Sequence, residues 1–110
     1  MGRAIAELFG SEGAHVFLIG RTRELMEQSK TTIERSGGRA TVAAFDIRDT
    51  AQLQRFIADV PAETGRLDIL VNNAAVQFPS TILEADPEHW RAMLETNVLA
   101  VLALSKSLRI

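Results

Sequence analysis

The sequence predicts an α/β fold in which helices cover a small parallel sheet. Short apolar stretches alternate along the chain with longer segments whose apolar residues recur every three or four positions, as on one face of a helix. The short stretches are apolar at almost every position, which is typical of strands covered on both faces. The 110 residues suffice for one domain, in the order helix, strand, helix, strand, helix, strand, helix.

The chain opens inside a helix. A helical spacing of apolar residues starts directly after Met1 and ends at Gly13; its apolar positions are Ala4, Ile5, Leu8 and Phe9. No strand, turn or capping residue stands before Gly2. The next stretch, His15–Ile19, is typical of a buried strand. We therefore expect a helix–strand unit that lacks the usual residues ahead of its helix.

A second helix–strand unit follows. Thr22 is a suitable N-cap for a helix that runs to about Arg35. Gly37 and the glycine after it are expected to end that helix. Ala40–Phe45 is the second expected strand, and it is again apolar along most of its length.

The third expected helix begins at Asp49 or Thr50, either of which can serve as its N-cap. Its apolar face repeats at positions i, i+3, i+4 and i+7, which are Leu53, Phe56, Ile57 and Val60. Pro61 is expected to end or kink this helix early, because proline lacks a backbone donor and clashes with the preceding turn.

A third strand and a long last helix complete the pattern. Leu67–Val71 is apolar except at Asp68 and is the expected strand. Asp86 and Pro87 form a typical N-cap and first helical position. The face of the last helix that we expect to be buried consists of Trp90, Met93, Leu94, Val98, Val101 and Leu102. With right-handed crossovers, such units build a doubly wound, Rossmann-like parallel sheet.

Composition excludes several classes of function. The net charge is −2 with acidic and basic residues interspersed, so we expect neither nucleic acid nor a membrane surface as a partner. The absence of cysteine excludes disulfides and thiol catalysis, and the two histidines lie too far apart in sequence to suggest a metal site. No apolar run is long enough to span a bilayer and no secretory signal is recognisable, so we expect a cytoplasmic location. The chain also contains no tyrosine.

Three stretches resemble the short-chain dehydrogenase/reductase family. GRAIAELFGSEGA is similar to the family's first helix, taken from the last glycine of its Thr-Gly-x-x-x-Gly-x-Gly loop, and AAFDIRD is similar to the end of its third strand. LDILVNNAA, followed by LETNVLA, resembles the fourth strand and fourth helix in the right order. The resemblance covers the whole chain. It implies a partial dinucleotide-binding domain, residues 1–110, with strands 2, 3 and 4 of the family fold and their flanking helices.

The resemblance implies NADP as the cofactor, with NAD less favoured. Gly2 matches the last glycine of the phosphate loop. NAD-preferring members carry an acid where this chain has Gly20, and Arg21 follows, a suitable partner for a ribose 2′-phosphate. Asp46 and Ile47 match the pair that contacts adenine. From the residues alone, Gly2 also fits a plain helix start, Arg21 a solvated loop and Asp46 a turn.

The other implied site residues include three that lie later in the chain. Asn73 and Ala74 match the stretch beside the adenosine ribose. Asn97 matches the family's catalytic asparagine, which holds a water that links the catalytic lysine to solvent. The alternative for Asn97 is a polar side chain satisfied within the core. Thr22 and Arg23 are candidate helpers for the phosphate, unless Thr22 only caps its helix.

The implied activity is hydride transfer between NADP(H) and a small carbonyl or alcohol substrate. The family's catalytic serine and its Tyr-x-x-x-Lys motif lie beyond the matched residues. Since the chain has no tyrosine, we expect it to be a fragment that is inactive by itself. The main alternative is a non-catalytic interaction module that associates with itself or with full-length family members through its last helix. A regulatory module that binds nucleotide is a further alternative.

Overall fold

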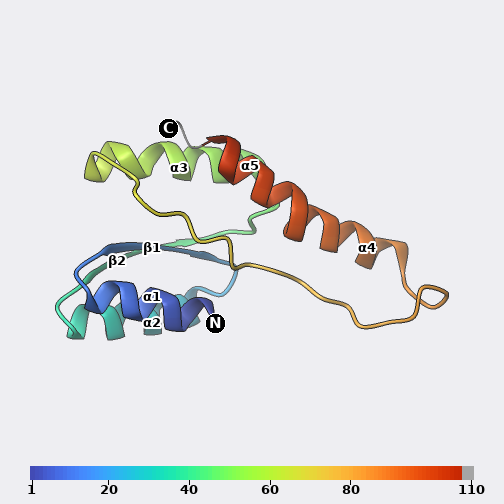
Figure 1. Ribbon diagram of the computed structural model, residues 1–110, viewed down its shortest axis with the longest axis horizontal. Coiled ribbons are helices and arrows are strands. Elements are labelled where there is room, and N and C mark those ends of the chain that lie inside the picture. Colours follow the sequence, from blue (N-terminus) through green and yellow to red (C-terminus); the bar gives the residue numbers. More distant parts are fainter. Residues whose placement is uncertain (108–110) are drawn as a thin grey trace. The chain divides into compact units, whose positions relative to one another are not determined.

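The computed structural model describes residues 1–107. The chain forms two compact units, the first ending at Asp46 and the second beginning at Ile47. The first unit holds α1 (Gly2–Ser11), β1 (His15–Gly20), α2 (Arg23–Arg35) and β2 (Arg39–Ala44) (Figure 1). The second holds α3 (Thr50–Thr64), α4 (Pro87–Leu94), the π-helical turn η1 (Glu95–Leu99) and α5 (Ala100–Ser107).

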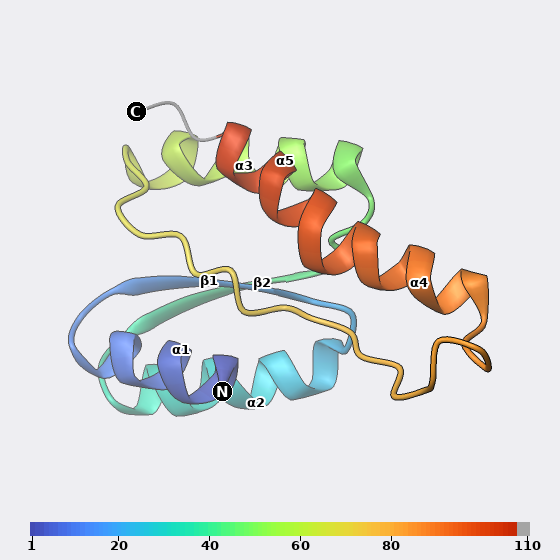
Figure 2. The ribbon, with the colours of Figure 1, turned by 45° about the vertical axis from the view of Figure 1, so that its right-hand side comes forward.

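The first unit is a pair of parallel strands with two helices on one face. β1 and β2 pair in register from His15 opposite Arg39 to Gly20 opposite Ala44. α1 and α2 lie side by side against the same face of this pair (Figure 2). The core between them consists of Ala6, Ile33 and Ala40, with Val16 and Leu18 packed against it. The prediction of both strands and both helices is therefore confirmed to within one or two residues at each end.

Two glycines allow close packing of α1 against α2. A Cβ atom at Gly10 would lie 2.5 Å from Cγ2 of Ile33, and a Cβ atom at Gly38 would overlap the carbonyl oxygen of Gly10. Ile33 is completely buried, so its side chain has no open space into which it could turn. Any larger residue at either glycine therefore forces the surrounding backbone to move.

In the second unit, α3 begins where the sequence predicts but ends later. The side chain of Asp49 caps the helix, because it accepts hydrogen bonds from the backbone N–H of Gln52 at 3.1 Å and from Nε2 of the same residue at 2.7 Å. The expected early end at Pro61 is wrong: the helix continues to Thr64.

Local contacts hold the last turn of α3 beyond Pro61, which has no backbone donor of its own. Thr64 Oγ1 donates to the carbonyl of Val60 at 2.8 Å, and the N–H of Gly65 donates to the carbonyl of Pro61 at 2.7 Å. Val60 is also buried, so packing holds the turn just before the proline. Gly65 then ends the helix in the left-handed conformation, with φ at 85°.

The third strand predicted over Leu67–Val71 is absent. The sheet among residues 1–107 has two strands, and residues 66–80 form neither helix nor strand. Ile69 and Val71 are 62% and 44% exposed. In a doubly wound sheet this strand pairs with the first strand of the fold, and among residues 1–107 no strand lies beside the segment. Without a neighbour to share its hydrogen bonds, the segment stays irregular.

The last helix is continuous but contains a π-helical turn. Asp86 caps the helix as predicted, its side chain accepting from the N–H of Glu88 at 2.9 Å. At the end of η1 the N–H of Ala100 bonds to the carbonyl of Glu95, five residues back instead of four. The extra residue rotates everything that follows by roughly 100° relative to an uninterrupted α-helix.

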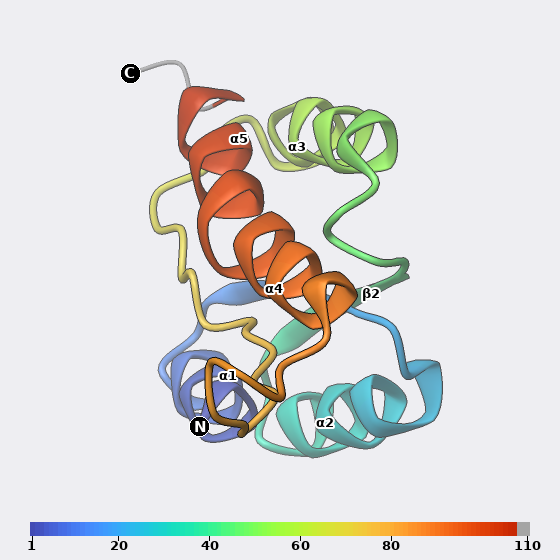
Figure 3. The same ribbon diagram turned by 90° about the vertical axis from the view of Figure 1, so that its right-hand side faces the viewer.

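The predicted buried face of this helix is wrong, both ahead of the π turn and after it. Four of its six expected members are exposed, namely Trp90, Leu94, Val98 and Leu102. The other two, Met93 and Val101, are half-buried. The buried positions are instead Thr96, Ala100 and Leu104, which recur at intervals of four residues. Within this unit α5 packs beside α3 (Figure 3).

Candidate functional site

The candidate site of the first unit lies where its two strands end. Because β1 and β2 are parallel, their carboxyl ends share one edge, and the N–H of Phe45 donates to the carbonyl of Gly20 there at 2.9 Å. Arg21 and Asp46 each follow directly. α1 runs antiparallel to β1, so Gly2 at its start lies toward the same edge. The unit thus brings three predicted residues to the edge at which doubly wound sheets bind ligands.

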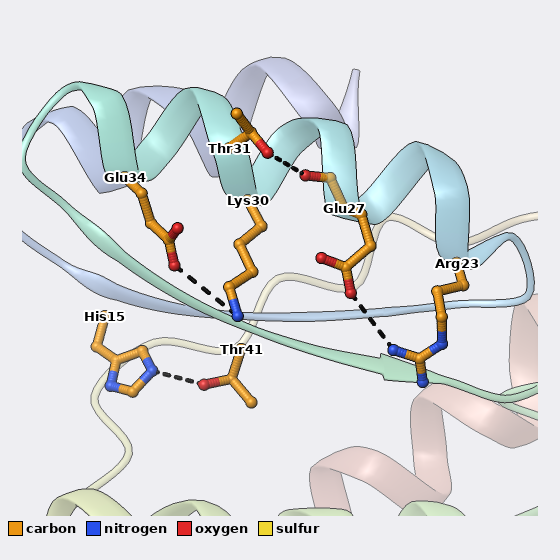
Figure 4. Close-up of polar contacts among 7 residues, drawn as sticks. All are labelled: His15, Arg23, Glu27, Lys30, Thr31, Glu34 and Thr41. Carbon is orange, nitrogen blue, oxygen red and sulfur yellow. Dashed lines mark hydrogen bonds and ion pairs between the residues drawn. The ribbon is translucent and has the colours of Figure 1, made fainter.

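Arg21 is the more available of the two arginines after β1. Its side chain is exposed and makes no hydrogen bond or ion pair with residues 1–107. Arg23 instead lies 3.5 Å from Oε1 of Glu27, one turn further along α2 (Figure 4). The five donors of the Arg21 guanidinium therefore remain available to an anion from outside the chain.

Thr22 is the N-cap of α2 by position, but its side chain makes no capping hydrogen bond. Its backbone is extended, with φ at −105° and ψ at 95°, and the N–H of Met26 reaches its carbonyl at 3.4 Å. The first N–H groups of α2 and the Thr22 hydroxyl are therefore not used by a cap. They add hydrogen-bond donors next to Arg21.

Asp46 and Ile47 lie at the junction of the two units, and both are half-buried. They form part of the connection from β2 to α3. The next residue, Arg48, belongs to the second unit, and its Nη1 lies 3.8 Å from Oε2 of Glu95 in the same unit. Both side chains of this ion pair are more than one third exposed, so it contributes little to stability.

In the second unit, Asn97 holds the segment that follows the expected third strand. Its Oδ1 accepts from the N–H of Val76, and its Nδ2 donates to the carbonyl of the same residue, both at 2.9 Å. The carboxamide of Asn97 thus supplies the acceptor and the donor that a neighbouring strand would otherwise offer to the backbone of Val76. Since Asn97 is exposed, the core alternative for this residue is wrong. Its role toward a water and a lysine stays a prediction.

Asn73 and Ala74 lie three and two residues before Val76 in the same irregular segment, and both are exposed. The bonds to Asn97, rather than a sheet, therefore set where this stretch runs. Sequence reasoning missed Val76 as the partner of Asn97. Only the backbone N–H and carbonyl of Val76 take part, and such groups leave no signal in a pattern of residue types.

Among the described residues, no group of three or more histidine, cysteine, aspartate or glutamate side chains is placed to hold a metal ion. No helix within residues 1–107 has the length and apolar character needed to cross a membrane. Within the first unit, the arrangement offers the donors of the Arg21 guanidinium and the first N–H groups of α2, which are groups that bind anions.

Comparison with known proteins identifies the family. The family model for short chain dehydrogenases matches residues 1–109. The 2,3-dihydro-2,3-dihydroxybenzoate dehydrogenase of Bacillus subtilis is 32% identical over 107 residues, which are 97% of this chain and 41% of that protein. The chain therefore belongs to the short-chain dehydrogenase family.

Solved structures of relatives share the α/β fold. A Burkholderia xenovorans protein described as a short-chain dehydrogenase/reductase matches with a TM-score of 0.91 at 36% identity, over 96% of this chain and 40% of that one. A metagenomic short-chain oxidoreductase in complex with NADP matches with a TM-score of 0.90 at 34% identity, over 96% of this chain and 48% of that one. The chain thus spans less than half the length of each of these relatives.

Proposed function

We propose that this chain is the nucleotide-binding part of an NADP(H)-dependent oxidoreductase, which transfers hydride between the nicotinamide and a small carbonyl or alcohol substrate. The observation that carries the proposal is the Arg21 guanidinium, which has no partner among residues 1–107 and lies at the carboxyl edge of the sheet. A 2′-phosphate supplies oxygen acceptors that suit the fork of a guanidinium. The structural relative that is a complex with NADP supports the same cofactor.

The residue before Arg21 supports a phosphorylated ribose as well. A carboxylate at position 20 would accept bonds from free ribose hydroxyls and repel a 2′-phosphate, and this chain has Gly20 there. A Cβ atom at Gly20 would lie 3.2 Å from Sδ of Met26. Met26 therefore occupies part of the space into which a larger side chain would extend.

The remaining contacts follow the cofactor along the chain. Gly2 and the first N–H groups of α1 would face the pyrophosphate. Asp46 would accept from the adenine amine with Ile47 against the ring, and Asn73 and Ala74 would line the adenosine ribose. NADP(H), when bound, supplies the hydride chemistry. In this proposal the residues of the chain bind and orient the cofactor, and Asn97 fixes the stretch that precedes Val76.

Calorimetric titration of the full chain with NADPH and with NADH tests the proposal. We expect Arg21→Gln to weaken NADPH binding about 10- to 100-fold, because it removes a charge-assisted hydrogen bond to the phosphate. NADH binding should change little, since NADH lacks that phosphate. Arg39→Gln, at the exposed start of β2 and therefore at the opposite edge of the sheet, is the matched control. Equal losses for both nucleotides, or binding of neither by the parent chain, would contradict the proposal.

A second candidate function is association with another family member through the last helix. Leu94 and Leu102 on this helix are 58% and 60% exposed, and Trp90 and Val98 are exposed between and beside them. Apolar side chains that gather on one element are typical of an interaction surface. This candidate does not require the chain to bind nucleotide.

Co-purification of the tagged chain with a full-length relative, such as the Bacillus subtilis dehydrogenase, tests the second candidate. We expect Leu94→Asp to abolish capture, because it places a charge within the apolar surface. Leu25→Asp is a matched control, since Leu25 on α2 is 57% exposed and lies outside the last helix. Capture that both substitutions reduce equally, or no capture by the parent chain, rules this function out.

A further inference from the structure

The segment after Asn73 is attached to the last helix at two points. The first is the pair of 2.9 Å hydrogen bonds between Asn97 and the backbone of Val76. The second is a stack of the rings of Phe78 and His89, with centroids 4.1 Å apart and planes inclined by 6°. His89 belongs to the first turn of α4, where its N–H bonds to the carbonyl of Asp86 at 2.9 Å.

The two attachments together restrict the segment more than either does alone. The two helix residues are eight positions apart, which is about 12 Å along a helix axis. Their partners are two residues apart, about 7 Å in an extended chain. The segment therefore runs along the helix in the opposite direction. A single attachment leaves a segment free to swing about one point, whereas a second attachment fixes its direction.

We propose that His89 is a positioning residue for the proposed cofactor contacts Asn73 and Ala74. It acts through Phe78. The stack of the two rings fixes the chain after Val76, and the bonds to Asn97 fix Val76 itself. The residues just before Val76 are then held to one backbone path. This inference rests on the proposed function, because it gives Asn73 and Ala74 a nucleotide to contact. His89 itself touches neither of them in this role and takes no part in hydride transfer.

Hydrogen exchange measured by NMR on the full chain tests the inference at the Val76 amide, which is the donor to Asn97. We expect His89→Ala to accelerate exchange at Val76 about three- to tenfold, the effect of losing one aromatic stack. His89→Phe keeps a ring opposite Phe78 and should restore the parent rate. Glu88→Ala, in the same helical turn, is the matched control for a change at the start of α4.

Nucleotide titration of the same variants supplies the second measurement. We expect His89→Ala to weaken NADPH and NADH by the same factor, because it disturbs the adenosine ribose contact that both share, and His89→Phe to restore both affinities. Absence of Val76 protection in the parent chain, an unchanged exchange rate in His89→Ala, or faster exchange with unchanged affinities would each overturn the inference. If the parent chain binds neither nucleotide, the proposed function fails and His89 loses its cofactor role with it. Exchange at Val76 still decides separately whether the stack holds the segment.

Discussion

Gly38 is a residue at which the first unit tolerates little change. A Cβ atom there would overlap the carbonyl oxygen of Gly10 and lie 2.9 Å from Cγ2 of Ile33. We expect Gly38→Ala to lower the free energy of unfolding by about 1–3 kcal/mol, the usual cost of overpacking a core. Urea denaturation followed by circular dichroism measures the change. Arg35→Ala, an exposed change in the last turn of α2, is the control, and equal midpoints for the two variants would contradict the steric explanation.

At the scale of single residues, the roles of the predicted side chains toward a cofactor stay predictions, and the backbone groups that side chains meet could not be predicted. Arg21 and Asp46 were predicted as site residues, and they lie just after the carboxyl ends of two parallel strands, which share one edge. The role of Asn97 toward the backbone of Val76 could not be predicted, because the partner is a peptide group 21 positions away. The stack of His89 on Phe78 has no sequence signal either, since it depends on the course of the irregular segment between them.

At the scale of elements, the cap of α3 gives a prediction about pH. Hydrogen bonds from the side chain and then from the backbone N–H of Gln52 lower the pKa of Asp49 below its usual value. A carboxyl whose pKa is lower in the folded state stabilises that state above its unfolded pKa, near 4, and the stabilisation is lost as the pH falls through the lower folded value. When the pH is lowered through this range, we expect the Asp49→Ala variant to lose less helicity than the parent chain.

Circular dichroism at a series of pH values measures this difference. Asp59→Ala on the same helix is the control, because Asp59 is exposed and does not cap α3. We expect that control to retain the pH dependence of the parent chain. A profile for Asp49→Ala that is superimposable on the parent's would show that the cap contributes nothing to the dependence.

The elements also show where periodicity stops being informative. Amphipathic spacing predicted α2 and the start of α3, since both are regular α-helices with one covered face. It failed for the buried face of the last helix, where Trp90 and Leu94 are exposed ahead of η1, and Val98 and Leu102 are exposed within and after it. It also failed for Leu67–Val71. An apolar stretch becomes a strand only when another strand lies beside it. Whether such a neighbour exists depends on the whole sheet and cannot be predicted from the residues of the stretch alone.

At the scale of the whole molecule, the predicted α/β class is confirmed, and the order of its elements departs from the prediction at the third strand. The chain spans 41% of the Bacillus subtilis dehydrogenase and contains no tyrosine. A phenol with a lowered pKa is the proton donor or acceptor that the family resemblance implies.

We therefore expect the purified chain to consume no NADPH when carbonyl substrates are added. The loss of NADPH absorbance over time, compared with a sample without protein, measures this. A full-length relative assayed in parallel shows that the conditions permit turnover. Consumption above the protein-free rate that persists after repeated purification would contradict the expectation and would require a different proton donor.

The π turn has a consequence for how this helix can change over time. Substitutions between Asn97 and Leu104 alter one contact each, whereas removal of one residue from 95–99 would alter the direction of every later side chain by roughly 100°. If the residue removed is Val98 or Leu99, Asn97 would keep its bonds to Val76, but Ala100 and Leu104 would turn away from α3. The number of residues in this stretch is therefore constrained more tightly than their identity. We expect homologues to differ here by substitutions and not by insertions or deletions.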